Sequence, residues 1–313
     1  MKRRHFLERT ALAGLGLTQT QAAAPSNDAS EKEAIIDVHQ HVNYSGRLNE
    51  DLVKHQGAMG ITKTVLLPAG SVTDRTTTHK GLSNGLAARI FGTKAAARLA
   101  AQHPDNYVYF ANEVPDLPEA AKAIEKWLKK GACGIGEQKF NLAIDAPEML
   151  KIYDVAREFQ VPVLIHIEHN RYNHGFERFH KILAKYPTVN FIGHAQTWWG
   201  NIDKEHQQEV MYPKTKVTQG GLTDRLLADY PNVYGDLSAG SGLNSMTRDL
   251  EHAAEFLIRH QDKLVLGTDC NDAVGIGEQC SGSEAIKTIR TLVPDVQMRA
   301  KIFSKNAQKI IRL

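Results

Sequence analysis

Four histidines and two acidic residues stand at or near the ends of short apolar segments of this sequence: His39, His41, Glu137, His166, His194 and Asp269. Imidazole nitrogens and carboxylate oxygens are the ligands that Zn²⁺ and related divalent cations take in proteins. His39 and His41 are two residues apart, so on a strand both side chains point to one face, and Asp37 starts the same inward row. The pattern predicts a divalent metal site, and a metal site of this kind can activate water for hydrolysis.

One histidine on an apolar strand is more often a hydrogen-bonded core residue than a metal ligand. That simpler interpretation applies to each histidine alone, but it does not explain why the whole set falls at strand ends. In a barrel of parallel strands, polar residues at the carboxyl ends meet in one shared site. The joint order of the set therefore favours a metal centre.

The segments that carry these residues are short and rich in Val, Ile and Tyr, and they alternate with segments of helical period. This alternation is typical of repeated βα units and a parallel sheet. Eight such runs are found, the number that closes a (β/α)8 TIM barrel, and they are Ala34–Val42, Lys63–Ala69, Tyr107–Val114, Cys133–Phe140, Pro162–Glu168, Asn190–Ala195, Asn232–Leu237 and Leu264–Asp269. An open doubly wound sheet is the alternative α/β fold, but it requires a glycine-rich phosphate turn after the first strand, and residues 43–47 (NYSGR) do not match one.

Apolar residues spaced three and four apart predict helices between these strands. The predicted helices are Leu86–Ala101, Pro118–Lys130, Pro147–Phe159, Phe176–Lys185, Arg248–His260 and Glu284–Leu292. The longest predicted loops are Gly70–Gly85 and Gly200–Gly221, which follow the second and sixth strands, where a barrel carries its binding loops.

Several short segments resemble the amidohydrolase superfamily: Asp37-Val38-His39-Gln40-His41, Gly136-Glu137, Ile165-His166, Gly193-His194 and Gly267-Thr268-Asp269. The C-terminal Phe303-Ser304-Lys305-Asn306-Ala307 resembles the closing helix of that superfamily. Residues 231–238 (PNVYGDLS) are similar to its amidohydrolase-related, or type 2, branch. The resemblance covers residues 34–313.

The resemblance implies that His39, His41 and Asp269 bind the first metal ion. It places His166 and His194 on a second ion or, in members with a single metal, makes one of them a ligand and the other a catalyst. It also makes Asp269 the general base. The expected cofactor is one or two divalent ions, with Zn²⁺ the favoured identity.

The fourth strand departs from one common pattern of the superfamily, in which a carboxylated lysine bridges two metals. Glu137 and Lys139 have the same strand parity, so either can face inward. Gly136-Glu137 looks more like members in which a glutamate bridges, including deoxyribonucleases of the TatD type. We therefore favour Glu137 as the ligand and Lys139 as a contact for a substrate anion, with a carboxylated Lys139 as the alternative.

Other residues near the predicted strand ends are candidates for substrate contact by location alone. Arg171 follows the fifth strand, and Trp198 follows the sixth, where it either forms an aromatic wall or packs over the barrel. His169 has the opposite parity to His166, so it is expected in a loop or beside a ligand rather than on the metal.

The N-terminus has the features of an export signal. Lys2, Arg3 and Arg4 precede a short apolar run, and Ala22, Ala23 and Ala24 follow it. The paired arginines resemble the twin-arginine signal. The sequence thus predicts a signal peptide at residues 1–24, a linker at 25–33 and a barrel domain at 34–313, with the mature protein in the periplasm or secreted and the export machinery as a partner.

Removal of that signal makes the chain formally neutral. The full sequence has 38 Lys and Arg against 35 Asp and Glu, and the signal holds Lys2, Arg3, Arg4, Arg9 and Glu8, which leaves 34 of each kind. A duplex-binding protein normally needs a basic surface, so the charge argues against nucleic acid as a partner. No second apolar stretch long enough for a membrane span follows Ser30, and a homo-oligomer is compatible with the sequence.

The three cysteines form neither a disulfide framework nor a CxxC zinc motif. Cys133 lies in a strand pattern and is expected in the core, whereas Cys270 and Cys280 are candidates for pairing after export.

These features predict hydrolysis of a C–N or C–O bond in a small carbonyl compound: an amide, a lactone or a cyclic imide. Asp269 accepts the proton of the attacking water, and His194 or His166 stabilises the oxyanion. The alternatives are a metal-dependent non-oxidative decarboxylase, which the type 2 branch implies, and a TatD-type phosphodiester hydrolase. A non-enzymatic carrier is disfavoured, because it would fill the open metal position that catalysis needs.

Overall fold

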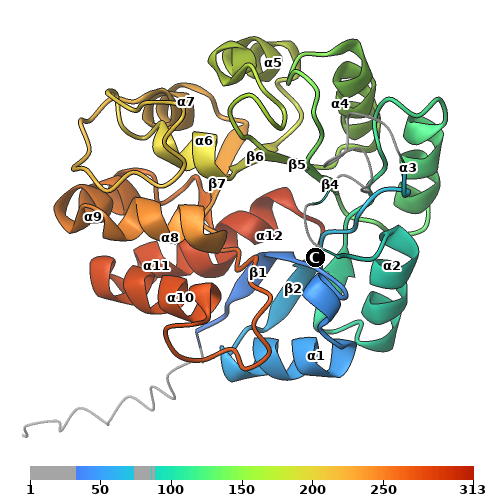
Figure 1. The fold of residues 1–313 in the computed structure, drawn as a ribbon. Helices are drawn as coiled ribbons and strands as arrows, with labels where there is room; N and C mark the ends of the chain where they lie inside the picture. Colours follow the sequence, from blue (N-terminus) through green and yellow to red (C-terminus); the bar gives the residue numbers. More distant parts are fainter. Residues whose placement is uncertain (1–32, 74–85, 87–88) are drawn as a thin grey trace, which may run out of the picture. The chain divides into compact units, whose positions relative to one another are not determined.

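The computed structural model describes residues 33–73, 86 and 89–313 (Figure 1). Residues 34–313 form one compact unit. The predicted signal peptide, the linker up to residue 32 and most of the predicted loop 70–85 lie outside the described residues. No helix in the described part of the chain is long and apolar enough to cross a membrane.

All eight predicted strands are present, and they run parallel in sequential order. They are β1 Ile36–Gln40, β2 Lys63–Leu66, β3 Tyr107–Tyr109, β4 Ile135–Gln138, β5 Val163–His166, β6 Phe191–His194, β7 Val233–Asp236 and β8 Leu264–Val265. Figure 1 shows them as a ring inside a ring of helices. The (β/α)8 TIM barrel is thereby confirmed as the fold.

The strand ladders fall into two sheets, β1–β3 and β4–β8, and isolated backbone contacts link the sheets. At one seam a parallel bridge joins Ala111 to Ile135. At the other, Val38 N donates to Leu266 O at 2.9 Å and Asp269 N donates to His39 O at 2.8 Å. The second seam therefore holds Asp269 directly beside His39.

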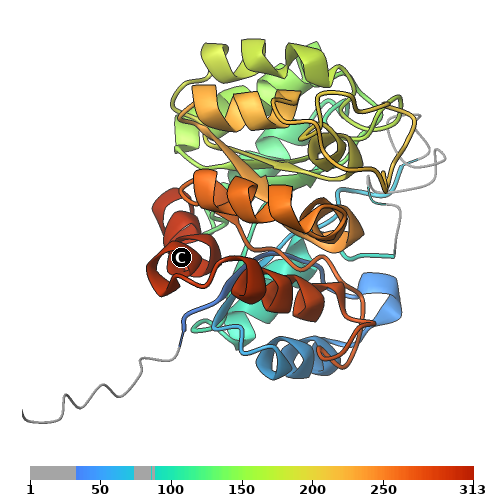
Figure 2. The same cartoon turned by 90° about the vertical axis from the view of Figure 1, so that its left-hand side faces the viewer.

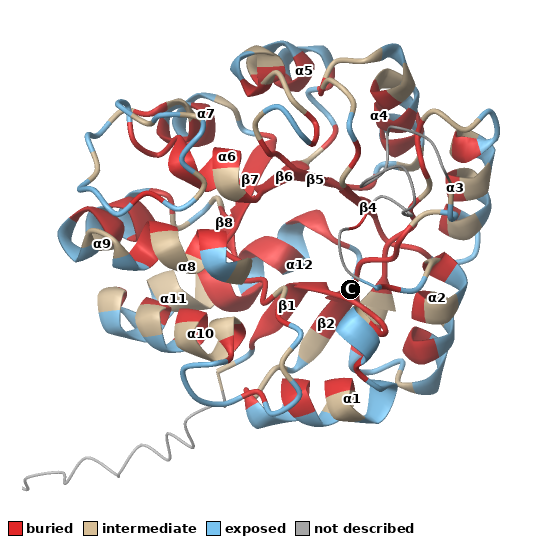
Figure 3. Ribbon diagram, viewed as in Figure 1, coloured by how far each residue is buried: buried red, intermediate tan, exposed pale blue. Residues whose placement is uncertain are grey.

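Helices cover the outside of the strands and bury one face each, as Figure 3 shows. They are α1 Asn49–Ala58, α2 Thr93–Gln102, α3 Ala120–Leu128, α4 Pro147–Phe159, α5 Phe179–Lys185, α6 Gln196–Gly200, α7 Leu222–Asp229, α8 Ala239–Thr247, α9 Leu250–Arg259, α10 Ser281–Leu292, α11 Val296–Ala300 and α12 Asn306–Ile310. Short 3₁₀ turns lie at Tyr44–Gly46 and Phe176–Arg178, and a π-helical turn lies at Lys301–Lys305.

Each of the six predicted helices has a counterpart, but the first was placed too early. Its predicted start, Leu86, precedes the observed start of α2 at Thr93, because Gly92 is extended and bridges to Ala69 beside the barrel. The apolar residues Leu86 and Ile90 instead pack with Ala69 in a small separate cluster. Helix α8 was not predicted, because its sequence AGSGLNSMT is rich in Gly and Ser, which have low helix propensity.

The apolar core has two main parts. The larger lies between the strands and the helices, and the smaller fills the barrel with side chains such as Val38, Val65, Leu164, Ile192 and Tyr234. Residues 307–311, in and just after α12, add Ala307, Ile310 and Ile311 to the interior cluster. Figure 2 shows α12 at one end of the barrel and the loops after β1 and β6 at the other. The polar strand ends therefore gather at the end opposite α12.

Strand β1 is irregular, and this corrects one expectation. The side chains of Ile36 and Val38 belong to the interior cluster, so regular alternation would turn His39 outward. The pairing with β2 shifts register between Asp37 and Gln40, and the two histidines reach the barrel mouth. Asp37 does not start their row: its Oδ2 accepts from Gln56 Nε2 of α1 at 2.7 Å, outside the barrel interior.

Candidate metal centre

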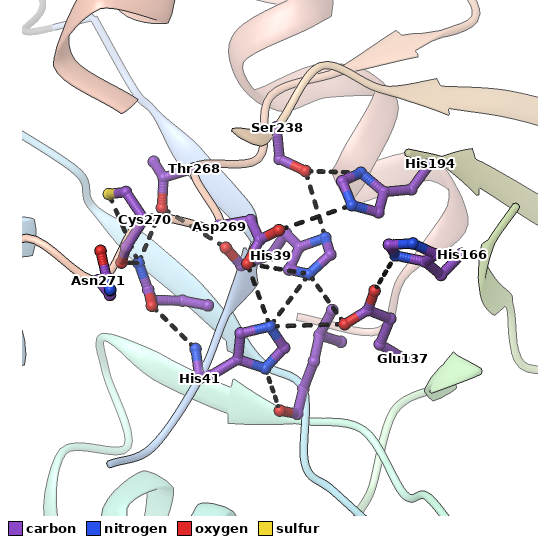
Figure 4. A network of polar contacts seen from close by, with 12 residues as sticks. His39, His41, Glu137, His166, His194, Ser238, Thr268, Asp269, Cys270 and Asn271 are labelled. Atoms are coloured by element: carbon purple, nitrogen blue, oxygen red, sulfur yellow. Dashed lines mark hydrogen bonds and ion pairs between the residues drawn. The ribbon is translucent and has the colours of Figure 1, made fainter. Parts of the chain in front are cut away.

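Five of the eight strands bring metal-binding side chains to the mouth of the barrel (Figure 4). His39 and His41 come from the end of β1, Glu137 from β4, and Asp269 from the segment after β8. His166 and His194 end β5 and β6 and are register partners. All of these histidines and Glu137 are buried, and the Asp269 side chain is 13% exposed. Parallel strands thus carry every predicted ligand to one place.

Four ligand atoms face one another at the centre of the group. His39 Nε2 lies 3.2 Å from His41 Nε2, and each of these nitrogens lies 3.5 Å from Glu137 Oε2. Asp269 Oδ1 lies 3.7 Å from His39 Nε2 and 3.3 Å from His41 Nε2. In a tetrahedral zinc site with bonds of about 2.05 Å, neighbouring ligand atoms are about 3.4 Å apart. The observed spacing fits that geometry.

Hydrogen bonds at the far side of each imidazole fix which nitrogen faces the centre. His41 Nδ1 lies 2.7 Å from the carbonyl oxygen of Leu67, which can only accept, so Nδ1 carries the proton. His39 Nδ1 lies 2.7 Å from Asp236 Oδ2 and donates to that carboxylate. Each Nε2 therefore presents a lone pair to the centre. Such carboxylate–histidine and carbonyl–histidine pairs are the usual support of histidine ligands.

The centre consequently holds two imidazole lone pairs and two carboxylate oxygens with no donor among these four atoms. Asp269 Oδ1 is buried and has no hydrogen-bond partner. Lone pairs and anionic oxygens repel one another at these distances unless a positive charge lies between them. A divalent cation satisfies all four atoms, so the residues fit a metal ion.

The electrostatics of the metal-free group agree with this interpretation. Burial lowers the pKa of His39, but the carboxylates of Asp269 and Asp236 raise it more, to well above its usual value. Burial raises the pKa of Asp269 and of Glu137, but contacts with histidines hold both well below their usual values. Both carboxylates are therefore ionised at neutral pH, and without a metal His39 binds a proton in its place.

Asp236 is a functional residue that the sequence analysis did not assign. It ends β7, is fully buried, and accepts from His39 Nδ1 and from Ser238 Oγ, each at 2.7 Å. Its position at a strand end is the same signal that identified His166 and His194. Tyr44 was also missed; its ring lies edge-on to His41, with centroids 5.0 Å apart, in the turn after β1.

Asp236→Asn is expected to weaken zinc binding by about 10- to 100-fold, the usual effect of losing a residue that supports a ligand. The amide keeps the shape of the carboxylate but removes the charge that holds the Nδ1 proton of His39. Competition with a chromophoric chelator measures the affinity. Asp105→Asn, at an exposed position, is the control and is expected to bind zinc as the wild type does. Equal affinities in both variants would contradict the supporting role of Asp236.

His166 differs from the two histidines of β1. Its Nδ1 lies 2.7 Å from Glu137 Oε1, and its Nε2 lies 3.2 Å from Glu168 Oε2. The shorter contact is a hydrogen bond rather than the edge of a coordination polyhedron. His166 thus orients Glu137, whose other oxygen faces His39 and His41. Glu137, His166 and His194 still lie close enough to form a second possible group of ligands.

His194 lies beside the four central atoms. Its Nδ1 is 2.9 Å from Ser238 Oγ, and that hydroxyl donates its proton to Asp236, so Ser238 accepts from His194. The other nitrogen, Nε2, then carries a lone pair 3.6 Å from Asp269 Oδ2. Burial, together with the positive charge of His39, lowers the pKa of His194. A neutral imidazole therefore faces the second oxygen of Asp269.

The residues predicted to contact substrate are placed differently from one another. Lys139 Nζ lies 5.3 Å from the centroid of the Tyr172 ring rather than among the ligands, where Glu137 lies instead. Arg171 has a half-exposed side chain and donates to Glu168 Oε1 at 3.0 Å. His169 lies in the loop after β5, where its backbone N–H donates to Thr197.

Trp198 does not form an aromatic wall, and this corrects the first of its two predicted roles. Its side chain is fully buried and packs edge-on against Phe176 and Phe179. The ring also covers Gly193 so closely that a Cβ there would lie 2.5 Å from it. Trp198 therefore packs over the end of β6, which matches the alternative interpretation of its position.

Comparison with known proteins places this arrangement among related barrels. The sequence model of the family described as amidohydrolase matches residues 36–313. No curated protein sequence matches.

Among solved structures, an amidohydrolase from Burkholderia multivorans with bound zinc is similar, with a TM-score of 0.58 and 11% identity over 88% of this chain and 98% of that one. A probable 2-pyrone-4,6-dicarboxylic acid hydrolase from Acinetobacter baumannii has a TM-score of 0.55 and 14% identity, with the same coverage of both chains. A 2,6-dihydroxybenzoate decarboxylase from Rhizobium has a TM-score of 0.52 and 13% identity over 89% of this chain and 98% of that one. At these identities the likeness is one of fold.

Proposed function

The chain belongs to the amidohydrolase family, whose model matches residues 36–313, and on that premise we propose that it is a metal-dependent hydrolase of a small carbonyl compound. The bond cleaved is a C–N or C–O bond of an amide, a lactone or a cyclic imide. The observation that carries this proposal is the set of four converging acceptor atoms on His39, His41, Glu137 and Asp269, which fits a tetrahedral Zn²⁺.

A divalent cation held by these residues supplies the Lewis acidity that lowers the pKa of a water molecule and polarises a carbonyl oxygen. Asp269 is the proposed general base. Its Oδ1 belongs to the central group, whereas Oδ2 lies outside it and faces His194 Nε2 at 3.6 Å. Because its pKa is held low, the carboxylate is ionised and can take a proton on Oδ2 as the water attacks.

His194 is the proposed second acceptor of that proton. Its neutral Nε2 receives the proton from Asp269 Oδ2, and the resulting imidazolium is stabilised by Asp236, whose Oδ2 lies 3.4 Å from His194 Nδ1. The protonated His194 can then donate to the leaving nitrogen or oxygen. The chain from Asp236 through Ser238 to His194 resembles the orienting acid of a catalytic triad in its logic, since it fixes the tautomer of the imidazole.

The geometry supports one catalytic ion rather than two. A second ion shared by Glu137 and His166 requires that the 2.7 Å hydrogen bond between them be broken. With that bond intact, Glu137 contributes one oxygen to the metal and His166 holds the other. Lys139 and Arg171 remain the proposed contacts for an anionic group on the substrate, because both are cationic and lie after β4 and β5.

The proposal is tested with purified protein, stripped of metal with a chelator and then reloaded with zinc, on a panel of lactones, cyclic imides, amides and esters. We expect turnover of at least one carbonyl class, loss of that turnover after chelation, and its return with zinc. Turnover that survives removal of the metal, or no turnover of any of these classes by the zinc-loaded protein, would refute it.

Non-oxidative decarboxylation is the second candidate, and a specific contact favours it. Arg171 is half-exposed and is held by Glu168, so its guanidinium is available to a carboxylate on an aromatic or enol acid. One similar structure is a decarboxylase. Release of carbon dioxide, measured on hydroxybenzoate-type acids, distinguishes this reaction from hydrolysis. The phosphodiesterase alternative is less favoured, since Lys139 and Arg171 are the cations expected near the mouth.

We also propose that the mature protein is exported to the periplasm or secreted, on the basis of the Arg3–Arg4 pair and the alanines before residue 25. Replacing both arginines with lysine is expected to retain the precursor in the cytoplasm. Unchanged delivery of that variant would refute the twin-arginine route.

A further inference from the structure

We propose that this protein binds a second zinc ion at a site separate from the candidate metal centre, formed by His55, Cys270, Cys280 and Asp272. These residues come from three elements: helix α1, the segment after β8, and the residue that caps the N-terminus of α10. His55 and Cys280 are fully buried and Cys270 is 5% exposed. The proposal does not depend on the reaction that the barrel mouth catalyses.

The distances among three of these ligand atoms match a tetrahedral site. Cys270 Sγ lies 3.7 Å from Cys280 Sγ, and His55 Nε2 lies 3.1 Å from Cys270 Sγ and 3.5 Å from Cys280 Sγ. With Zn–S bonds of about 2.3 Å and a Zn–N bond of about 2.05 Å, tetrahedral geometry separates the sulfurs by about 3.8 Å and each sulfur from the nitrogen by about 3.6 Å. One ion can therefore contact all three atoms with small adjustments.

The imidazole of His55 is oriented as a ligand requires. The amide nitrogen of Gln56 donates to Asp37 Oδ2 at 2.7 Å and to Thr64 Oγ1 at 2.9 Å, so the amide oxygen is left as an acceptor. That oxygen lies 3.2 Å from His55 Nδ1, which therefore carries the proton. His55 Nε2 is left with a lone pair directed at the two sulfurs, the arrangement found for zinc-binding histidines.

Asp272 is the fourth ligand. Its Oδ2 lies 3.8 Å from His55 Nε2, and the backbone N–H groups of Val274 and Gly275 donate to the same oxygen. Arg47 secures this turn by donating to the carbonyl oxygens of Cys270 and Asp272. Four protein ligands leave no open position for water, so the site is structural rather than catalytic.

The position of the site gives it a role in holding the catalytic loop. Cys270 is the residue directly after Asp269, so an ion bound to its sulfur ties the Asp269 loop to α1 and to the start of α10. The ion would act as a cross-link between three segments that are distant in sequence. We expect it to stabilise the position of Asp269 without touching the substrate.

A disulfide between Cys270 and Cys280 is the competing state of the same sulfurs. Both cysteines are free in the structure, with the sulfurs at contact distance rather than bonded. A disulfide would use both sulfurs and leave the lone pair of His55 Nε2 without a thiol partner. The third ligand and its fixed orientation therefore favour a metal ion.

Cobalt is the probe for this site, because a thiolate bound to Co²⁺ gives a charge-transfer absorption in the near ultraviolet. The ligands of the candidate metal centre contain no sulfur, so this band reports the cysteine site alone. We expect the reduced, chelator-treated protein to show the band when Co²⁺ is added, and Cys280→Ser to lose at least about half of it with one of two thiolates gone. Cys133→Ala, at a buried cysteine inside the barrel, is expected to keep the full band.

The wild-type spectrum decides the matter even if Cys280→Ser does not fold. Cobalt binding without the thiolate band in reduced wild-type protein would overturn the proposal. An undiminished band in a folded Cys280→Ser variant, or an equal loss in Cys133→Ala, would do the same. A Cys270–Cys280 disulfide found by non-reducing peptide mapping of the protein as isolated would show that the sulfurs pair instead. Hydrolytic activity is not part of any of these readouts, so this test is independent of the proposed reaction.

Discussion

Asp269→Asn is expected to lower kcat by at least about a hundredfold, the scale on which loss of a general base acts, while most of the catalytic metal stays bound. Asparagine keeps an oxygen that can replace Asp269 Oδ1 in the central group. Its amide nitrogen, in place of Oδ2, would donate to His194 Nε2 and cannot accept a proton from water. The variant therefore keeps the metal but loses the proposed base.

The measurement is kcat at saturating substrate together with zinc content per chain, for the variant and for Asp105→Asn as an exposed control. The control is expected to match the wild type in both. If Asp269→Asn keeps its zinc and a near-normal kcat, Asp269 is not the base, and the proton acceptor would have to be His194. If it loses the zinc, Asp269 is primarily a ligand.

The second large effect is expected for His41→Ala, which should lose the catalytic zinc and, with it, activity by more than about a hundredfold. His41 Nε2 lies within 3.2 to 3.5 Å of three other central atoms, on His39, Asp269 and Glu137. Removing it leaves two carboxylates and one imidazole, which bind zinc less tightly, and the Lewis acidity of the metal accounts for several kcal/mol of catalysis.

His180→Ala is the matched control, because His180 is also a histidine on the barrel domain and its Nδ1 contacts only a backbone carbonyl, that of Glu177, among its hydrogen bonds in the described chain. Zinc content and activity are measured side by side. Zinc at the proposed cysteine site is expected to remain in both variants, so His41→Ala should lose one ion rather than all of the metal. Full occupancy of the barrel mouth in His41→Ala would remove His41 from the ligand set.

The barrel could be predicted from sequence because its strands are short and apolar and are separated by helices of clear period. The runs around Leu164 and Ile192 show how this works: inside a parallel barrel both faces of a strand are buried, so the run is apolar throughout until the polar residue at its end. The same rule brought His166 and His194 together, which the register of β5 and β6 reproduces.

Other features depend on three-dimensional detail that spacing does not encode. Asp37 and His39 share strand parity, yet the register shift in β1 sends them to different surroundings. Trp198 follows a strand end like the site residues, but the small Gly193 beneath it leaves room for the ring to pack into the core. His55 is 215 residues from Cys270, so no local motif marks the cluster that they form.

Asp236 is a different case, because the information was present in the sequence. It is the last residue of a predicted strand and has the parity of the interior residue Tyr234. The strand-end rule therefore predicts Asp236 at the mouth as firmly as it predicts His166. What sequence alone did not supply is its role: a carboxylate there can bind metal directly or support a histidine, and only the 2.7 Å contact with His39 Nδ1 distinguishes the two.

Anomalous X-ray diffraction at the zinc absorption edge, from crystals of the zinc-loaded wild-type protein, tests the central claim most directly. The account predicts a peak at the barrel mouth about 2.1 Å from the Nε2 atoms of His39 and His41, with oxygens of Glu137 and Asp269 completing the coordination. Zinc-loaded crystals with no anomalous peak between these four side chains would contradict it, whatever metal was found elsewhere in the molecule.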